Sequence, residues 1–352
     1  MKVVTVGAGP CGLYASRLLS DMGHEVTLLE EHSTVGEPVQ CAGLVGKKLI
    51  DIIGDEHVIN KIDGANIHLG DRHFTLERKD VAYVLDRCSF DRSLGEGLDI
   101  FYNSRVLGVD AHGNEYTIRS ASVDHSADIV IGADGPNSIV GRDLRFNSDI
   151  RLYPAYQERV RFSPEDEGMV TIDVVRPFFS WIIPEGNGIV RLGTVGDREN
   201  ISRMKRRFGV QGETISTIKA PIPIGRSDLC KGNAFLVGDA AAQTKPLTGG
   251  GLYYGIRGAS MLAEAIGNGE PHTYEKLWCD KFGKEIGTSM RARKIYEAMS
   301  QSDLEKAFEI LSQKKCMIER DANFERHSSA LRVLLTSPGL ISILGKNITS
   351  LF

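Results

Sequence analysis

The sequence has no cysteine pair and no histidine spacing of the kinds that form a disulfide framework or bind a metal. Its six cysteines are scattered without a Cys-x-x-Cys pair, and its nine histidines lack the spacing of metal ligands. No metal site is therefore predicted, and a reducing, intracellular compartment is the simpler expectation.

Long apolar runs and an excess of basic charge are absent as well. No uninterrupted run reaches the ~18 residues that indicate a membrane span, and the nearest candidate, residues 331–352, is broken by Arg332, Ser337, Pro338 and Lys346. Residues 1–6 run directly into a glycine motif, which predicts that there is no cleavable signal peptide. We expect a cytoplasmic protein whose apolar tail either packs on its own domain or touches the cytoplasmic face of a membrane.

The bulk composition is that of an ordinary globular protein. The chain is 41% hydrophobic and 25% charged, and its formal net charge of -4 gives no sign of a nucleic-acid partner. With 352 residues it can bury a large core, which is expected to divide into two interleaved or consecutive domains.

The first thirty residues have the pattern of a dinucleotide-binding unit. An apolar strand at residues 2–6 is followed by Gly7, Gly9 and Gly12 in a G-x-G-x-x-G turn, then by a helix from about Pro10 to Met22. A second strand ends at Glu30. Such glycines let a pyrophosphate approach the helix N-terminus, and the acid accepts hydrogen bonds from a ribose. The combination favours a dinucleotide site over a glycine turn without a ligand.

A second glycine-rich stretch lies at residues 236–251. A short strand ends at Gly238-Asp239, a loop with Pro246 follows, and three glycines, Gly249 to Gly251, begin a helix with clear apolar periodicity. This arrangement brings a carboxylate and free helical N–H groups to one place, where they would stabilise negative charge on a docked group. We expect that group to be a flavin ring.

Three segments between these motifs allow two interpretations each. Cys41 lies among small residues, either close to a ligand or as a buried structural cysteine. Arg87 stands where a strand meets a helix that Ser89 is predicted to cap, and it would either reach a phosphate or adenine edge or form a surface ion pair with a neighbouring acid. The turn at residues 132–135 fits a nucleotide-binding sheet or an ordinary loop.

The middle of the chain has β character, and its end is helical. Residues 60–80 predict a hairpin, and residues 150–224 predict an antiparallel sheet whose aromatic residues, Phe178, Phe179 and Trp181, occupy both faces of one strand. A basic cluster follows, either a solvated helix face or a contact for anionic headgroups: Arg203, Lys205, Arg206 and Arg207.

Taken in order, these motifs resemble a known superfamily. The turn at Gly7 to Gly12 with Glu30, then Asp86-Arg87, residues 132–135, and Gly238-Asp239 with Pro246 resemble the FAD domain of the p-hydroxybenzoate-hydroxylase-like flavoproteins, over residues 1 to about 270. The resemblance implies an α/β fold with additional antiparallel β structure. A Rossmann-like FAD-binding domain would comprise residues 1–149, with the hairpin insertion at about 60–80, and residues 229–272. An antiparallel-sheet substrate domain (150–228) would be inserted, and a C-terminal helical region (273–352) would follow.

Three further motifs resemble one family within it, the geranylgeranyl reductases. They are Pro38-x-x-Cys41-Ala42-Gly43, Phe179-x-Trp181-x-x-Pro184 and Thr248-Gly249-Gly250-Gly251. Members of that family saturate isoprenoid double bonds, including those of archaeal membrane lipids. Their usual strand motif is Tyr-x-Trp-x-Phe-Pro-Lys, whereas Phe179, Ile183 and Glu185 stand here. Any role of the tyrosine hydroxyl or of the lysine therefore does not transfer.

The resemblance also implies site residues. Cys41 and Trp181 become catalytic candidates. The FAD contacts are expected at the pyrophosphate turn, the ribose, the adenine, the ribityl linker and the pyrimidine end of the flavin, from Gly7, Gly9, Cys11, Gly12, Glu30, Cys41, Ala42, Arg87, Val106, Asp239, Gly249, Gly250, Gly251 and Leu252.

The implied reaction is hydride transfer from reduced FAD to one alkene carbon while a proton reaches the other, from Cys41, a tyrosine such as Tyr253, or water. The implied partners are an isoprenoid lipid and an electron donor, which is NAD(P)H, ferredoxin or a reduced deazaflavin. The alternatives are an FAD- and NADPH-dependent monooxygenase, a prenyl-quinone reductase, and a prenyl-binding carrier without flavin. Intact Glu30, Arg87 and Asp239 argue against the carrier.

Overall fold

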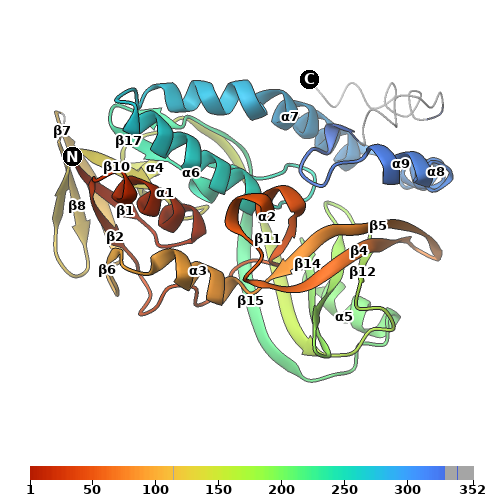
Figure 1. Cartoon of the computed structure of the whole chain (residues 1–352). Helices are drawn as coiled ribbons and strands as arrows, with labels where there is room; N and C mark the ends of the chain where they lie inside the picture. The colour runs from red at the N-terminus through yellow and green to blue at the C-terminus, as the bar shows by residue number, and fades with distance from the viewer. Residues whose placement is uncertain (114, 330–338, 340–352) are drawn as a thin grey trace.

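The computed structural model describes residues 1–113, 115–329 and 339. Two large sheets lie side by side, and α7 runs along one edge of both (Figure 1). The helices of the described residues are α1 (Pro10–Asp21), α2 (Lys47–Ile53), α3 (Arg87–Gly95), α4 (Ile139–Asp143), α5 (Glu199–Arg207), α6 (Leu252–Gly267), α7 (Thr273–Ala298), α8 (Gln301–Gln313) and α9 (Lys315–Asp321).

The first sheet has six strands in the order β16-β17-β10-β1-β2-β6, parallel except for the β16–β17 pair. Residues Val3 to Val6 of β1 are all buried, as expected when helices cover both faces of a parallel sheet. The predicted Rossmann-like fold is confirmed. The strands are β1 (Lys2–Val6), β2 (Glu25–Leu29), β6 (Asp99–Phe101), β10 (Ile129–Gly132), β16 (Cys230–Lys231) and β17 (Ala234–Leu236).

The second sheet has eight strands in the order β15-β11-β14-β13-β12-β4-β5-β3. Neighbours pair antiparallel, except that β12 runs parallel to β4. The predicted antiparallel β structure is therefore confirmed, with one parallel pair added. Its strands are β3 (Leu44–Gly46), β4 (Val58–Leu69), β5 (Arg72–Leu85), β11 (Ser148–Arg161), β12 (Met169–Asp173), β13 (Ser180–Gly186), β14 (Ile189–Val195) and β15 (Thr214–Ser227).

Three local predictions differ from the structure. The hairpin expected at residues 60–80 spans β4 and β5, and it joins the second sheet because β12 pairs with β4. Strand β13 begins at Ser180, so Phe178 and Phe179 precede it. Ser89 does not cap α3, because the Asp86 carboxylate takes the Ncap position and accepts the Ser89 N–H at 3.2 Å.

The remaining elements are a small third sheet and the helices that pack on the six-stranded sheet. A three-stranded sheet consists of β7 (Val106–His112), β8 (Glu115–Ser120) and β9 (His125–Ala127). Helices α1 and α6 pack on each other over the six-stranded sheet. Among the described residues, no helix has the length and apolar character needed to cross a membrane. The apolar tail considered above lies outside the described residues, apart from residue 339.

Candidate active site

The turn between β1 and α1 has the geometry that a pyrophosphate requires. Gly7 adopts a φ of +97°, and a Cβ atom on Gly12 would lie 2.1 Å from the Gly7 carbonyl oxygen. A Cβ atom on Gly9 would meet none of the described residues within 4 Å, which leaves space beside the start of α1. The helix has no side-chain cap, and its first N–H groups can bind an anion. The structure thus brings together Gly7, Gly9 and Gly12 with Cys11, which lies in the first turn of α1.

Glu30 follows the end of β2 and faces this turn. Its carboxylate accepts hydrogen bonds from the Ala8 N–H at 2.8 Å, from the His32 N–H at 2.9 Å and from His32 Nδ1 at 2.6 Å. A carboxylate offers about four acceptor positions, so one stays open to a ribose hydroxyl. Glu30 is buried, which fixes that open position beside the glycine turn.

Arg87 is the first residue of α3 and is buried. Its guanidinium donates to both carboxylate oxygens of Asp91, through Nε at 3.1 Å and Nη2 at 2.8 Å. The ion pair expected as one interpretation therefore exists, but it is buried rather than on the surface. Its charge also acts on Cys11 and Asp239, which places Arg87 at the same site as the glycine turn.

Asp239 carries the carboxylate that the second glycine-rich stretch was predicted to present. It lies on η1 (Gly238–Ala241), directly after β17. Burial raises the pKa of Asp239 to about 6 against the opposing charge of Arg87. Within the described parts of the chain, no hydrogen bond reaches its side chain. A half-buried carboxylate without a partner is suited to accept hydrogen bonds from the hydroxyl groups of a ligand.

Cys11 lies where α1, η1 and α6 meet. Its sulfur would be 2.3 Å from a Cβ atom placed on Gly255 and 2.9 Å from one placed on Gly238. Burial and the Asp239 charge raise the pKa of the Cys11 thiol. The side chain is therefore an unreactive packing group, and the main chain of Cys11, in the first turn of α1, is the part that could bind an anion.

The three glycines before α6 lie directly beside Asp239. A Cβ atom on Gly251 would be 3.1 Å from Asp239 Oδ1, and Gly251 is the residue before the first turn of α6. Leu252, the first residue of α6, is buried. The Thr248 hydroxyl oxygen is buried and has no hydrogen-bond partner among the described residues. An unpartnered hydroxyl, an unpartnered carboxylate and open space at Gly9 together fit FAD.

Lys245 adds a buried cation that the sequence did not predict. Its ammonium pairs with Glu325 Oε2 at 3.0 Å and donates to the Phe324 carbonyl at 3.2 Å. Its Cε would be 2.8 Å from a Cβ atom on Gly250. Because 80 positions separate the two partners, no local pattern could have indicated the pair.

Two other expected positions have structural surroundings of their own. Val106 is buried in the core around the six-stranded sheet. The Asp134 carboxylate accepts from the Ser138 hydroxyl at 2.6 Å and from the N–H groups of Ile139 and Val140. The turn at residues 132–135 is thus tied to the N-terminus of α4.

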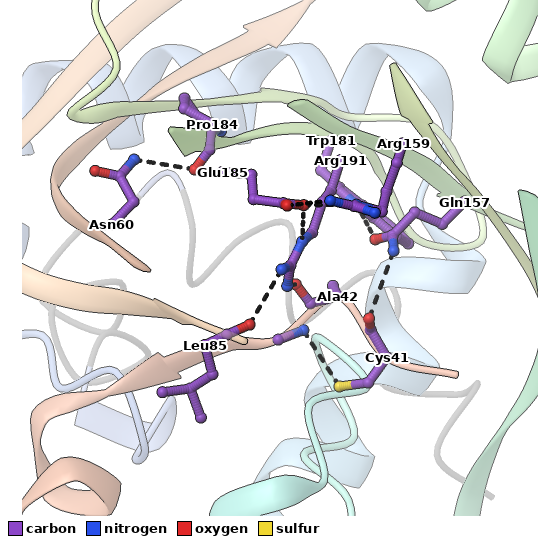
Figure 2. A network of polar contacts seen from close by, with 11 residues as sticks. Cys41, Ala42, Asn60, Leu85, Gln157, Arg159, Trp181, Pro184, Glu185 and Arg191 are labelled. Atoms are coloured by element: carbon purple, nitrogen blue, oxygen red, sulfur yellow. Dashed lines mark hydrogen bonds and ion pairs between the residues drawn. The ribbon is translucent and has the colours of Figure 1, made fainter. Parts of the chain in front are cut away.

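The loop that carries Cys41 lies against the second sheet, where Gln157 and Arg191 reach its backbone (Figure 2). Cys41 is half-buried, and its sulfur accepts the Gly43 N–H at 3.3 Å. Its carbonyl oxygen accepts from Gln157 Nε2 of β11 at 3.4 Å. Cys41 also interacts electrostatically with Arg87 and Cys11, so the structure brings it to the expected cofactor contacts, along with Ala42.

Trp181 joins the same network from β13. Its indole N–H donates to Gln157 Oε1 at 3.1 Å, so one glutamine connects the two catalytic candidates, Trp181 and Cys41. The indole lies across Gly193 of β14, where a Cβ atom would be 2.2 Å from the ring. Phe179 packs edge to face on it, with ring centroids 6.0 Å apart. The aromatic residues therefore form an apolar surface beside the Cys41 loop.

A buried ion cluster supports this loop from the second sheet (Figure 2). Glu185 accepts from Arg159 Nε at 2.9 Å and from Arg191 Nε at 2.8 Å. Arg191 also donates to the carbonyl oxygens of Ala42 at 2.8 Å and Leu85 at 3.1 Å. Burial raises the pKa of Glu185, but the hydrogen bonds from Arg159 and the Arg191 charge outweigh it, and the pKa lies below its ordinary value. Glu185, which stands where the family usually has a lysine, thus has two cationic partners.

Arg293 of α7 joins the two halves of the site. Its guanidinium donates to the carbonyl oxygens of Pro246, Leu247 at 2.9 Å and Pro177 at 2.8 Å. It also stacks 3.5 Å from the Phe178 ring centroid. One buried side chain therefore holds the loop before the three glycines against the aromatic segment. Burial lowers the pKa of Arg293.

The polar residues of the second sheet and of α7 were missed by sequence reasoning: Gln157, Arg159, Arg191, Arg293 and the Lys245–Glu325 pair. Their contacts depend on strand register and on helix docking. Only the departure at Glu185 from the family motif hinted at a changed charge arrangement. No cluster of three metal-ligating side chains occurs among the residues that the structure describes.

Comparison with known proteins places this geometry in context. Residues 5–41 match the model of the NAD(P)-binding Rossmann-like domain. A digeranylgeranylglycerophospholipid reductase of Methanococcoides burtonii is 30% identical over 360 residues, which cover 86% of this chain and 85% of the relative. An uncharacterised protein of Methanocaldococcus jannaschii is 29% identical over 94% of each chain.

A solved structure has the same fold over almost the whole chain. It is that of a geranylgeranyl bacteriochlorophyll reductase-like protein from Thermoplasma acidophilum, with a TM-score of 0.81 and 22% identity. The match covers 98% of both chains.

Proposed function

The chain belongs to the digeranylgeranylglycerophospholipid reductase family, and on that premise we propose that it is an FAD-dependent reductase of an isoprenoid lipid. The proposed reaction saturates C=C double bonds of a geranylgeranyl-type chain. The observation that carries the proposal is the position of the Cys41 loop, which contacts Gln157 beside Trp181 and interacts with Arg87 of the dinucleotide site.

Residues from both glycine-rich stretches would hold FAD. The N–H groups at the start of α1 bind the pyrophosphate, Glu30 accepts from the ribose, and Asp239 accepts from the ribityl hydroxyls. The glycines before α6 leave its N-terminus open beside the flavin, where the helix dipole favours negative charge. When bound and reduced, FAD supplies a hydride to the substrate.

The proton would come from Cys41. An isolated alkene is a very weak base, so proton donation must accompany hydride addition at the neighbouring carbon, in surroundings that exclude water. The S–H bond of Cys41 breaks, a C–H bond forms, and the thiolate regains its proton from solvent. Tyr253, the other side chain considered, packs on Tyr254 and Phe282 at 5.6 and 6.1 Å between ring centroids, within the helical layer.

The aromatic residues would bind the isoprenoid chain. Phe178, Phe179 and Trp181 form a continuous set with Tyr153, and Phe178 and Trp181 are buried. An apolar surface of this kind stabilises an alkyl chain by burying its area and keeps water from the reacting carbons. We assign cofactor binding to residues 1–149 and 229–272, substrate binding to residues 150–228 with the β4–β5 hairpin, and support of both to residues 273–352.

The electron donor and the membrane contact belong to the same proposal. NAD(P)H, ferredoxin and a reduced deazaflavin are the donors that we propose to test. Arg203 and Arg206 are exposed on α5, whereas Lys205 and Arg207 pair with Glu158 and Asp173. The two exposed arginines are the proposed contact for anionic headgroups.

The test is mass spectrometry of lipids from cells that express the protein together with a pathway to unsaturated isoprenoid lipids. The expected result is a gain of about 2 mass units for each C=C bond reduced, because hydride and proton both enter the product. An oxygen-containing product would favour the monooxygenase. Unchanged lipids, from cells in which the purified protein carries FAD, would contradict the proposal.

A further inference from the structure

Arg191 connects three segments that are distant in the sequence. Its side chain leaves β14 and donates three hydrogen bonds: to Glu185 on β13, to Ala42 in the Cys41 loop, and to Leu85 at the end of β5. The side chain is only 8% exposed. These three partners of the buried guanidinium lie in different segments. Arg191 fixes their relative positions, because moving any of the acceptor oxygens away would leave a charged N–H donor without a hydrogen bond.

The charges in this cluster are poorly explained by stability alone. Glu185 and Arg191 are both buried, with side chains 9% and 8% exposed. Removing two such charges from water costs about as much as their attraction returns, and packed apolar residues are often as stable. The ion pair also sets an orientation, because Glu185 holds the Arg191 guanidinium with its remaining N–H groups facing the Cys41 loop.

The Cys41 loop is held at two consecutive carbonyl groups. Gln157 binds the Cys41 carbonyl, and Arg191 binds the next carbonyl, that of Ala42. Gly43 has a φ of +67°, and a Cβ atom there would be 2.2 Å from Arg191 Nη1, so the close approach requires glycine. The Gly43 N–H in turn donates to the Cys41 sulfur, which leaves the S–H proton for a partner outside the loop.

From these contacts we propose that Arg191, oriented by Glu185, is the positioning residue of Cys41 in alkene protonation. The inference rests on the proposed function, in which Cys41 donates the proton. Arg191 itself touches no reacting atom. It sets the place of the thiol by holding the Ala42 carbonyl, and it ties this loop to Leu85, two residues before Arg87 of the cofactor site.

The experiment compares FAD-loaded wild type with Arg191→Gln, Arg191→Lys and Glu185→Gln. Arg161→Gln is the matched control, because Arg161 lies on β11 and forms an exposed pair with Glu213. The first measurement is the rate at which iodoacetamide alkylates Cys41, resolved from the other cysteines by peptide mass spectrometry. We expect the Cys41 alkylation rate to change about fivefold or more in Arg191→Gln and by a smaller factor in Arg191→Lys and Glu185→Gln. The rate should not change in Arg161→Gln.

The second measurement is the rate of alkene reduction with and without Cys41. Arg191→Gln is expected to lower kcat about 100-fold, as a misplaced catalytic group does, with little change in KM. In a Cys41→Ala background the same substitution should lower kcat no further, because the group it positions is gone. An equal decrease in both backgrounds would overturn the proposal.

The two measurements separate this inference from the proposed function. If wild type reduces no alkene, the proposed function fails, while the alkylation rates still decide whether Arg191 positions the thiol. If Arg191→Gln does not fold, Arg191→Lys decides the matter through circular dichroism, FAD affinity and alkylation. Changed alkylation with native FAD affinity supports the proposal, and unchanged alkylation overturns it.

Discussion

Lys245 and Glu325 form a buried ion pair, 3.0 Å between Nζ and Oε2, that joins the loop before the three glycines to the segment after α9. Glu325 also accepts the Gly46 N–H at 3.1 Å, and the Tyr254 hydroxyl donates to its carbonyl oxygen. The C-terminal segment is thus part of the structure around the cofactor site. Breaking the Lys245–Glu325 pair is therefore expected to lower the stability of the protein.

Glu325→Gln should destabilise the protein strongly. The substitution leaves the Lys245 ammonium buried without a counter-ion, which costs about 3–5 kcal/mol in comparable sites. The free energy of unfolding in urea measures the loss. Lys245→Met combined with Glu325→Gln should recover part of it, because the unpaired charge is then removed. The exposed pair Lys276–Asp280 is the control, and Asp280→Asn should leave the unfolding free energy unchanged.

Asp239→Asn should weaken FAD binding and at the same time stabilise the cofactor-free protein. The carboxylate has no partner among the described residues, and burial raises its pKa to about 6. Loss of a charged acceptor for a ligand hydroxyl is expected to lower FAD affinity about 10-fold or more. Removal of the poorly solvated charge should raise the unfolding free energy at pH 7 by up to about 3 kcal/mol. Fluorescence titration with FAD and urea unfolding measure the two effects.

The pH dependence of that stability has a defined sign. Because the pKa of Asp239 is raised in the folded state, the folded protein holds the proton more tightly than the unfolded chain. Wild type without cofactor should therefore lose stability relative to Asp239→Asn as pH rises from about 4 to 6. The difference in unfolding free energy between the two proteins, here called the gap, should persist above that range. Asp21, exposed at the end of α1, provides the control Asp21→Asn. A gap that instead closes with rising pH would contradict the prediction.

Cys41→Ala should keep FAD bound but slow alkene reduction. Loss of a positioned general acid typically lowers the rate about 10²- to 10⁴-fold. Single-turnover oxidation of the reduced flavin by substrate, followed by its absorbance, measures the step directly. Cys279→Ala, at an exposed position on α7, should turn over like wild type. Unchanged turnover in Cys41→Ala would remove Cys41 from the mechanism.

Gly193→Ala should displace the Trp181 ring and weaken substrate binding. The added Cβ atom would lie 2.2 Å from Cζ2 of the indole, so the ring must tilt and the hydrogen bond to Gln157 is strained. We expect KM for the isoprenoid to rise about 10-fold, with overpacking costing about 1–3 kcal/mol. Tryptophan fluorescence of the cofactor-free protein reports the shift, since the chain has two tryptophans. FAD affinity should stay unchanged.

Gly283→Ala is the matched control for this substitution. Gly283 lies within α7, where a Cβ atom would have Cys279 Cβ, at 3.9 Å, as its one neighbour among the described residues. Alanine should stabilise the helix slightly there and leave the Trp181 fluorescence and KM unaltered. A similar rise of KM in both variants would show that the effect does not depend on the indole.

The cofactor half of the site was predictable because its signals are local. The glycine turn, Glu30 and the helix after Gly251 are each set by a strand, a turn and a helix that follow one another in the chain. The error at Ser89 is also local, since Asp86 three residues earlier caps the helix by accepting the Ser89 N–H, and Ser89 becomes part of the first turn. The helix therefore begins at Arg87, three residues before the start that a Ser89 cap would give.

The substrate half depends on pairings that the sequence does not reveal. Arg159, Glu185 and Arg191 meet because β11 and β13 both flank β14, a register that no periodicity encodes. The β4–β5 hairpin joined the second sheet through the parallel pair Ile67–Ile172, more than a hundred positions apart. The contacts of Arg293 depend on the docking of α7 onto two loops. Long-range contacts of this kind decide which polar groups share a network.

The strand order of the six-stranded sheet has a consequence for how the protein is made. Strand β10 lies between β1 and β17, so the first glycine turn stays without Asp239 until the last third of the chain is synthesised. Roughly 230 residues separate Gly12 from Asp239, on the order of 10–45 s at ribosomal rates of about 5–20 residues per second. Once β10 has been synthesised, one of its edges is open to wrong pairing until β17 follows about 100 residues later. A cofactor that needs both glycine-rich stretches can therefore bind only after synthesis has passed Asp239.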